Sequence, residues 1–188
     1  MNVRAFFALR VPDRVTRKLA DYADELCQFD KELQIDWVDS GNYHLTLCFL
    51  GDVTLEQVEL LESKTREVLK AKRFSVALDH IGYYAVSPRF SVVAAMAAAQ
   101  AELADLHQCL VDIATACGLS YDEKNFLPHV TLGRVPAEDK FELNTEHLPA
   151  LGLSLPADAV VLMQSRVGEQ GSIYTPLFEI DLPLQLAN

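Results

Sequence analysis

No apolar run in this chain is long enough to cross a bilayer. The longest, Val92 to Ala99, holds eight residues, whereas a membrane-spanning helix needs about 20. The N-terminal residues also lack the basic segment, apolar centre and small-residue cleavage site of a secretion signal. We therefore expect a cytoplasmic protein that has no membrane partner.

Basic residues are scarce. The 188 residues include 16 Lys and Arg against 27 Asp and Glu, which gives a formal net charge of −11. Proteins that coat nucleic acid need many cationic contacts to phosphates, so this composition argues against that class. Binding of a single RNA end requires only a few local donors and stays compatible. With 50% hydrophobic and 23% charged residues, the chain has the composition of a globular protein.

Several signatures of cofactor and metal sites are missing. The chain has neither a P-loop nor a dinucleotide glycine fingerprint, and it has no His-x-His or His-Glu-x-x-His metal pattern. The four cysteines lack the Cys-x-x-Cys spacing and are expected to be free thiols that pack as small hydrophobes. They are Cys27, Cys48, Cys109 and Cys117. The sequence therefore predicts neither a cofactor nor a bound metal.

Two short segments of alternating apolar residues are present, Tyr43–Phe49 and Pro128–Gly133. Such alternation predicts half-buried β-strands, whose side chains point in turn to opposite faces. Each segment holds a His-x-Thr triplet, so a histidine and a threonine would share the polar face of each strand. These residues are His44 and Thr46 in the first segment, and His129 and Thr131 in the second.

The same alternation predicts where the neighbouring side chains point. It assigns Cys48 to the face of His44, where it would line a cleft, and Phe49 to the apolar face. It assigns Arg134 to the buried face of the second strand, unless a β-bulge at Gly133 turns that side chain round.

Two His–Thr pairs that meet across a cleft would suit the cleavage of a phosphodiester without a metal. Imidazole has an unperturbed pKa of about 6.5, so one ring can be neutral and the other charged near pH 7. The threonine hydroxyls would donate hydrogen bonds to the non-bridging oxygens, where negative charge develops. Arg134 is the main candidate for a cation that binds the phosphate, and Arg166 is a weaker one.

Other interpretations are compatible with the same residues. The two histidines could make only local hydrogen bonds on edge strands, or the groove could belong to a metal-dependent phosphodiesterase. A third alternative is a non-catalytic RNA- or nucleotide-binding module. The remaining histidines, His80, His107 and His147, are expected to be structural or exposed. Tyr83 and Tyr84 could border a ligand or pack in an ordinary loop.

Periodicity predicts the surrounding elements. Strands are expected at residues 3–9, 74–78, 90–95, 159–164 and 173–182, and the first motif strand is expected to end at Gly51-Asp52. Helices are expected from Pro12 to Phe29, from Thr54 to Val68, and up to a cap at Gly118. Loops are expected at 82–88 and 136–156. Strand, helix and motif strand thus occur twice. The prediction is an α+β fold with two pseudo-symmetric lobes of largely antiparallel sheet, helices outside and a central groove. It would form a single bilobal domain over residues 1–188, as a monomer.

Segments that match the pattern of a known enzyme superfamily occur along nearly the whole chain. They are Arg4–Leu9, Trp37–Val38, Asn42–Leu47, Phe49–Gly51, Phe126, Pro128–Arg134, Ser165–Arg166, Gly171 and Tyr174. Through them the chain resembles the two-histidine phosphoesterase superfamily, and within it the RNA 2′,3′-cyclic phosphodiesterases, also called 2′-5′ RNA ligases. The resemblance implies the same two-lobed fold and hydrolysis of RNA 2′,3′-cyclic ends to 2′-phosphate ends.

The resemblance also implies roles for single residues. His44 would give a proton to the leaving 3′ oxygen, His129 would take one from water, and an arginine belongs at the position of Arg134. In reverse, the same groups would join RNA ends through a 2′-5′ bond, a secondary activity because bulk water favours hydrolysis. The expected partners are RNA ends or small cyclic nucleotides.

Overall fold

The computed structural model describes residues 2–30, 34–121, 126–136, 151–168 and 171–184. Within these residues the chain forms three α-helices, a short 3-10 helix and nine β-strands. In chain order they are β1 (Asn2–Arg10), α1 (Asp13–Cys27), β2 (Asp36–Trp37), η1 (Ser40–Asn42), β3 (His44–Thr54), α2 (Leu55–Val68), β4 (Phe74–Ser87), β5 (Phe90–Ala97), α3 (Ala101–Ala116), β6 (His129–Pro136), β7 (Leu153–Ala157), β8 (Ala159–Gly168) and β9 (Gly171–Asp181). None of the helices in these ranges is both long and apolar enough to traverse a bilayer.

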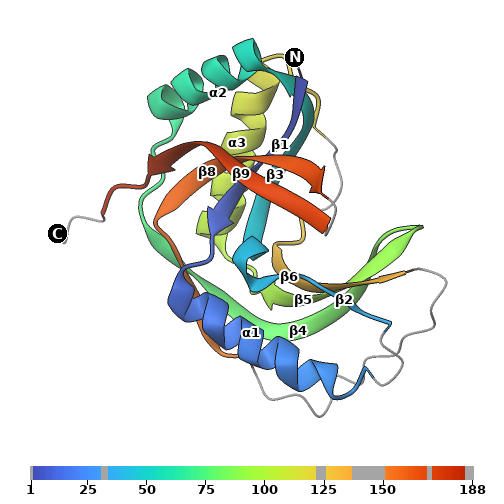
Figure 1. Cartoon of the computed structure of the whole chain (residues 1–188). Coiled ribbons are helices and arrows are strands. Elements are labelled where there is room, and N and C mark those ends of the chain that lie inside the picture. The colour runs from blue at the N-terminus through green and yellow to red at the C-terminus, as the bar shows by residue number, and fades with distance from the viewer. Residues whose placement is uncertain (1, 31–33, 122–125, 137–150, 169–170, 185–188) are drawn as a thin grey trace.

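The strands form one antiparallel sheet in the order β7-β4-β5-β6-β3-β1-β8-β9, and β2 pairs with β6 off this path (Figure 1). The middle of the sheet is a narrow seam, because β3 and β6 share one register pair, Leu45 opposite Val130. On either side of the seam the ladders are long. The sheet therefore consists of two four-stranded halves that meet along the motif strands, and the predicted α+β fold with two lobes is confirmed.

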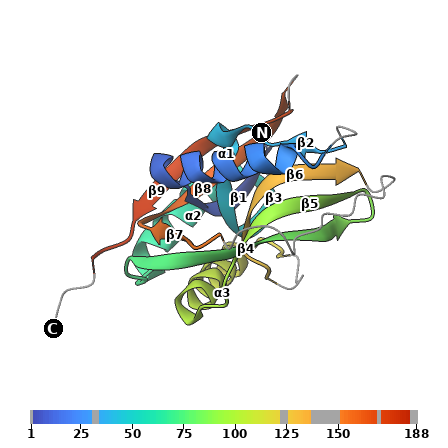
Figure 2. The ribbon, with the colours of Figure 1, turned by 90° about the horizontal axis from the view of Figure 1, so that it is seen from below.

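The two halves repeat one arrangement. The motif strands are β3 and β6. In each half, two paired strands are connected in sequence through a helix: β1 and β3 through α1, and β5 and β6 through α3. The helices are exchanged between the halves, since α1 contacts β6 and β7 while α3 contacts β3. Figure 1 and Figure 2 show α1 and α3 on opposite sides of the molecule. One buried cluster includes Leu9, Leu19, Leu110 and Leu155, so both halves share a core.

The ends of the helices differ partly from the prediction. The capping box at the start of α2 is present, with reciprocal hydrogen bonds between Thr54 and Gln57. However, α1 ends at Cys27, and Phe29 is exposed. The reason is the buried Asp30, whose carboxylate accepts hydrogen bonds from the backbone N–H groups of residues 34 and 35 and turns the chain back toward the sheet. Val68 at the end of α2 is also exposed rather than part of a buried stripe.

Three predicted breaks in strands are wrong. β3 continues past Gly51-Asp52 to Thr54, because the positive φ of Gly51 accommodates a bulge there. The supposed loop 82–88 is mostly strand, since β4 pairs with β5 up to Ser87. Gly82 suits this pairing because a Cβ there would lie 2.7 Å from Cγ of Met96.

The third wrong break concerns the predicted loop 136–156, which contains the start of an edge strand. β7 pairs with β4 despite Pro156, and an edge strand tolerates a residue that has no N–H to donate. Residues 137–150 lie outside the described residues. The closing strands are longer than predicted: β8 continues to Gly168 and β9 begins at Gly171, so that their ladder extends from the Ala159–Asp181 pair to the Gly168–Gly171 pair.

Candidate active site

A groove of about 480 Å³ opens at the seam where β3 and β6 meet. Its lining includes the five residues predicted to act on a phosphate: His44, Thr46, His129, Thr131 and Arg134. Other lining residues come from β1, β4, β5, β8 and β9. Both halves of the sheet therefore form its walls, and the two His–Thr pairs face one cleft.

A β-bulge follows the first His–Thr pair. Thr46 and Cys48 pair with adjacent residues of β1, which leaves Leu47 as an extra residue. Because this residue reverses the alternation, Cys48 is buried in the core, while Phe49 lines the groove and is 40% exposed. The predictions that Cys48 lines the cleft and that Phe49 lies on the apolar face are therefore wrong.

A second bulge follows the second pair at the same spacing. Thr131 and Gly133 pair with adjacent residues of β5, so Leu132 is the extra residue. After it, Arg134 points into the groove rather than the core. Gly133 is required here because a Cβ would collide with Cγ2 of Ile35. The bulge that the sequence left open thus occurs, one residue before the predicted glycine.

Both imidazoles are anchored in the same way. Nδ1 of His44 lies 2.7 Å from the carbonyl oxygen of Asn42, and Nδ1 of His129 lies 2.7 Å from that of Leu127. A carbonyl oxygen only accepts, so Nδ1 carries the hydrogen and donates it in both rings. Nε2 is thereby left as the nitrogen of each ring that can take or give a proton, although Nε2 of His129 also contacts the hydroxyl of Tyr84.

The seam also sets how the two pairs lie relative to each other. The seam pairs Leu45 with Val130, and an antiparallel register extended from this pair by one residue in each direction would set His44 beside Thr131 and Thr46 beside His129. The two imidazoles are then diagonal neighbours, for which a Cβ separation of about 7 Å is typical. Both imidazoles line the same groove.

Burial lowers the pKa of both histidines. For His44 this is the main effect; the bond to the Asn42 carbonyl opposes it, and the positive charges of His129 and Arg134 lower the pKa further. For His129, burial likewise outweighs the raising effect of the Leu127 carbonyl. Each ring therefore favours its neutral form near pH 7.

Tyr84, expected in a loop that either borders a ligand or packs at the surface, lies on β4 and contacts His129. Its hydroxyl lies 2.6 Å from Nδ1 and 2.8 Å from Nε2 of His129. Burial raises the pKa of Tyr84, so the phenol stays protonated. Since Nδ1 gives its hydrogen to Leu127, the phenol O–H is the donor toward Nε2. The periodicity of β4 was hidden by Gly82 and Pro88, and this pairing could have been found only from the register with β5.

Aromatic rings surround His44. The ring of Phe6 lies 4.9 Å from it and that of Tyr174 lies 4.7 Å from it, centroid to centroid. The Tyr174 hydroxyl also accepts a long hydrogen bond of 3.4 Å from Nη2 of Arg134. Tyr174 therefore connects the cation of one half to the imidazole of the other, a contact that no local pattern in the sequence indicates.

The other candidates lie elsewhere. Arg166 is exposed, donates from Nη2 to Oε1 of Gln164 at 3.0 Å, and is not among the described residues that line the groove. His80 is exposed beside Asp79, and His107 is bonded to the backbone of β3. His147 lies outside the described residues.

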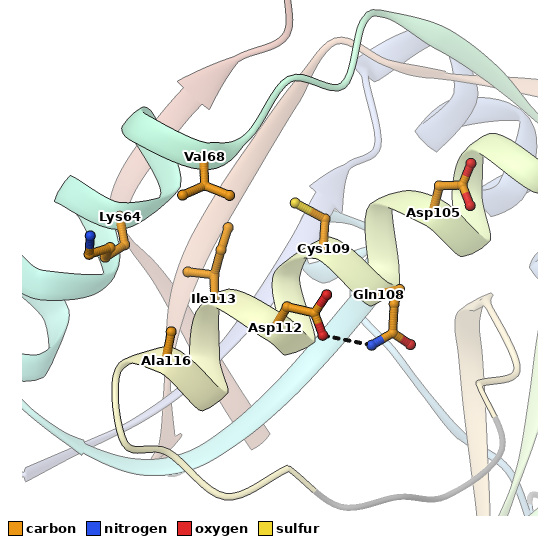
Figure 3. Close-up of a pocket in the computed structure, with 8 residues that line it drawn as sticks. All are labelled: Lys64, Val68, Asp105, Gln108, Cys109, Asp112, Ile113 and Ala116. Carbon is orange, nitrogen blue, oxygen red and sulfur yellow. Dashed lines mark hydrogen bonds between the residues drawn. The ribbon is translucent and has the colours of Figure 1, made fainter.

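A second hollow, of about 470 Å³, lies between α2 and α3 (Figure 3). Lys64, Val68, Cys109 and Asp112 contribute to its walls, and the His–Thr pairs do not. In the part of the chain that the structure describes, no group of three or more His, Cys, Asp or Glu could hold a metal ion. The groove at the seam is therefore the place where groups suited to proton transfer and phosphate binding converge.

Comparisons with known proteins show which proteins the chain resembles in sequence and fold. A family model described as LigT like Phosphoesterase matches residues 9–91. An RNA 2′,3′-cyclic phosphodiesterase of Thermotoga maritima is 29% identical over 181 residues, 94% of each chain. Another from Methanothermobacter thermautotrophicus is 28% identical, over 94% of this chain and 97% of its own. The crystal structure of E. coli LigT complexed with 3′-AMP has a TM-score of 0.80 at 25% identity and covers 97% of this chain and 99% of its own. That of E. coli LigT complexed with NADP+ has a TM-score of 0.77 at 26% identity, over 96% and 98%.

Proposed function

Because the chain belongs to the LigT-like phosphoesterases of the two-histidine superfamily, we propose that its single bilobal domain, residues 1–188, hydrolyses RNA 2′,3′-cyclic phosphodiester ends to 2′-phosphate ends. The reaction uses neither a metal ion nor a cofactor. One observation carries the proposal: two imidazoles, each fixed through Nδ1 on a carbonyl two residues upstream, offer Nε2 to one groove.

Hydrolysis requires one proton to leave the attacking water and another to reach the departing oxygen. Nε2 of His129 takes the water proton as the new P–O bond forms. Nε2–H of His44 gives its proton to O3′ as the P–O3′ bond breaks, so the products are a 3′-hydroxyl and a 2′-phosphate. Each well-placed group typically contributes about 10²–10⁴ in rate. The identity of donor and acceptor follows the family pattern, since the two anchors are alike.

The groove supplies stabilising groups for the charge of the transition state. The hydroxyls of Thr46 and Thr131 donate to the non-bridging oxygens, and the guanidinium of Arg134 binds the same oxygens. Preorganised donors of this kind contribute about 2.7–4 kcal/mol each where single ones have been removed. The crossed arrangement of the pairs sets one hydroxyl next to each imidazole, on both sides of the phosphorus.

Substrate binding also favours the protonated form of His44, which the mechanism requires. In the free protein, the positive charges of His129 and Arg134 lower its pKa, in addition to burial. A bound phosphate anion neutralises Arg134 and favours the imidazolium, so His44 gains its proton when the substrate binds. The acid is thereby formed where the leaving oxygen lies.

The substrate is an RNA end or a small cyclic nucleotide. Solved relatives that carry 3′-AMP and NADP+ support a nucleotide as the occupant of this fold. The same groups would also join RNA ends if a 5′-hydroxyl attacked the cyclic phosphate in place of water: its proton passes to Nε2 of His129, the P–O3′ bond breaks, O3′ takes the proton of His44, and a 2′-5′ bond forms. Water at its bulk concentration competes with that hydroxyl, so ligation is the minor activity.

The test is to supply the purified protein with an RNA that ends in a 2′,3′-cyclic phosphate, in the presence of EDTA, and to determine the position of the product phosphate. We expect a 2′-phosphate, and loss of at least about 10²-fold in rate for His44→Ala and for His129→Ala. His80→Ala is the matched control, because His80 is exposed and outside the groove, and it should retain full activity.

Each other result points to a defined alternative. A 3′-phosphate product would reverse the assignment of the leaving oxygen. Loss of activity in EDTA would indicate a metal-dependent phosphodiesterase. Binding of the RNA without turnover, retained in both alanine variants, would indicate a non-catalytic binding module.

A further inference from the structure

Among the histidines that the structure describes outside the groove, His107 contacts both the first motif strand and the segment that leads into the second. It lies on α3, is partly buried, and its Nδ1 is 2.6 Å from the carbonyl oxygen of Leu47. Leu47 is the extra residue of the β3 bulge, between Thr46 and Cys48. A bulge removes its extra residue from the regular ladder, and a buried backbone carbonyl needs a partner. His107 supplies that partner from a helix 60 residues away in sequence.

The contact with the Leu47 carbonyl determines which nitrogen of His107 carries the hydrogen. Nδ1 faces a carbonyl oxygen and therefore donates, so Nε2 of the neutral ring is an acceptor. The hydroxyl of Tyr121 lies 3.2 Å from Nε2 and donates to it. The ring thus has a hydrogen-bond partner at each nitrogen and a single orientation relative to β3.

The face of the His107 ring contacts the segment that leads into the second motif strand, β6. Phe126 stacks on His107 with a centroid distance of 3.9 Å and an interplanar angle of 4°. Phe126 directly precedes Leu127, whose carbonyl anchors Nδ1 of His129. One imidazole therefore contacts the bulge that follows Thr46 and the segment that anchors the opposite histidine.

We infer that His107 is a positioning residue for the reaction: it holds the Leu47 bulge and the Phe126–Leu127 approach in register, so that the two His–Thr pairs face one phosphate. This inference rests on the proposed function. The Leu47 bulge determines the faces of Cys48 and Phe49, and the seam has one register pair between β3 and β6. The α3 imidazole adds a link between β3 and the segment that leads into β6.

Two substitutions separate the hydrogen bond from simple packing. His107→Leu keeps an apolar side chain of similar size and removes the donor. His107→Asn keeps a donor at the same place, because Nδ2 of asparagine and Nδ1 of histidine are both attached to Cγ. A displacement of about 1 Å at a reacting group can cost about 10²-fold in rate. We therefore expect kcat of His107→Leu to fall by about 10- to 100-fold with KM nearly unchanged, while His107→Asn retains most of its kcat.

The experiment measures kcat and KM on the cyclic-phosphate RNA well below the melting temperature of each variant, together with the ring resonances of His44 and His129 by NMR. His80→Leu is the matched control and should match the wild type. Ring resonances of His44 and His129 that shift in His107→Leu, but not in His107→Asn, support the inference even if no turnover is detected. An active wild type whose kcat is unchanged in His107→Leu overturns it, as does an equal loss in both His107 variants.

Two further outcomes are also decisive. If the wild-type protein shows no turnover and the ring resonances of His44 and His129 do not shift in His107→Leu, both the proposed function and this inference are refuted. If the wild-type protein shows no turnover but those resonances shift, only the proposed function is refuted. If His107→Leu does not fold, the nitrogen resonances of His107 in the wild type decide. A hydrogen on Nδ1, together with retained kcat in His107→Asn, supports the inference, and a hydrogen on Nε2 overturns it.

Discussion

Substitution of Gly133 by alanine should reduce both the stability and the activity of this protein. Gly133 follows the Leu132 bulge and precedes Arg134, and it pairs with Trp37 of β2 on one side. An added Cβ would collide with Cγ2 of Ile35 and would lie 3.3 Å from Cε3 of Trp37. Ile35 is 6% exposed and β-branched, so its side chain has little freedom to move away.

The expected loss of stability in Gly133→Ala follows from overpacking. An extra methyl group in a tightly packed site typically costs about 1–3 kcal/mol. For a chain of this size, 1 kcal/mol corresponds to about 2–4 °C in melting temperature, so Gly133→Ala should melt roughly 2–12 °C below the wild type. If β2 moves outward to relieve the clash, Arg134 moves with it, because Arg134 pairs with Asp36 of the same strand. A loss of about 10- to 100-fold in kcat/KM is then expected.

Thermal denaturation and steady-state kinetics on the cyclic-phosphate RNA measure the two effects. Gly82→Ala is the matched control, since the atoms nearest its Cβ would be Cγ of Met96 at 2.7 Å and Sδ of the same residue at 3.0 Å. Methionine is unbranched and adaptable, so the melting temperature should fall less. A Gly133→Ala protein with unchanged melting temperature and unchanged kcat/KM would refute the reasoning about the bulge and the guanidinium it positions.

Three further outcomes are expected. Arg134→Gln should lower kcat/KM by at least about 10²-fold without lowering the melting temperature, because the guanidinium is a donor to developing charge rather than a core group; steady-state kinetics and thermal denaturation check this. Because burial lowers the pKa of both His44 and His129, kcat/KM should be highest below pH 7. The basic limb of the kcat profile should lie at higher pH than that of kcat/KM, because the bound anion raises the pKa of His44. A profile of kcat/KM centred above pH 7 would contradict the burial effect. Tyr84→Phe removes the hydroxyl that donates to Nε2 of His129, so the base becomes more available and its pKa, followed by NMR titration, should rise.

The local part of the site could be predicted from the sequence. Alternation depends only on backbone geometry, so it identified two strands with a histidine and a threonine on one face. It failed at Cys48 and Phe49 because a bulge is set by pairing with the neighbouring strand, and Leu47 looks like any apolar strand residue. Arg134 illustrates the same limit, since only the register with β5 decides which face it takes.

Contacts between distant elements were beyond any local pattern. Tyr84, Tyr174 and His107 reach the site or its support from β4, β9 and α3, after 45, 40 and 60 residues of separation from their partners. Their positions depend on the order of the strands and on the exchange of helices between the halves. The long β4 was missed for a related reason: Gly82 and Pro88 break strands in isolation, yet here the glycine fits beneath Met96.

The most direct measurement is a crystal structure with a bound nucleotide 2′-phosphate. The account predicts the phosphorus between the two imidazoles, with Nε2 of His44 and Nε2 of His129 each in hydrogen-bond contact with a phosphate oxygen from opposite sides. A phosphate held elsewhere, for example between α2 and α3, or contacted by only one of the two rings, would contradict it.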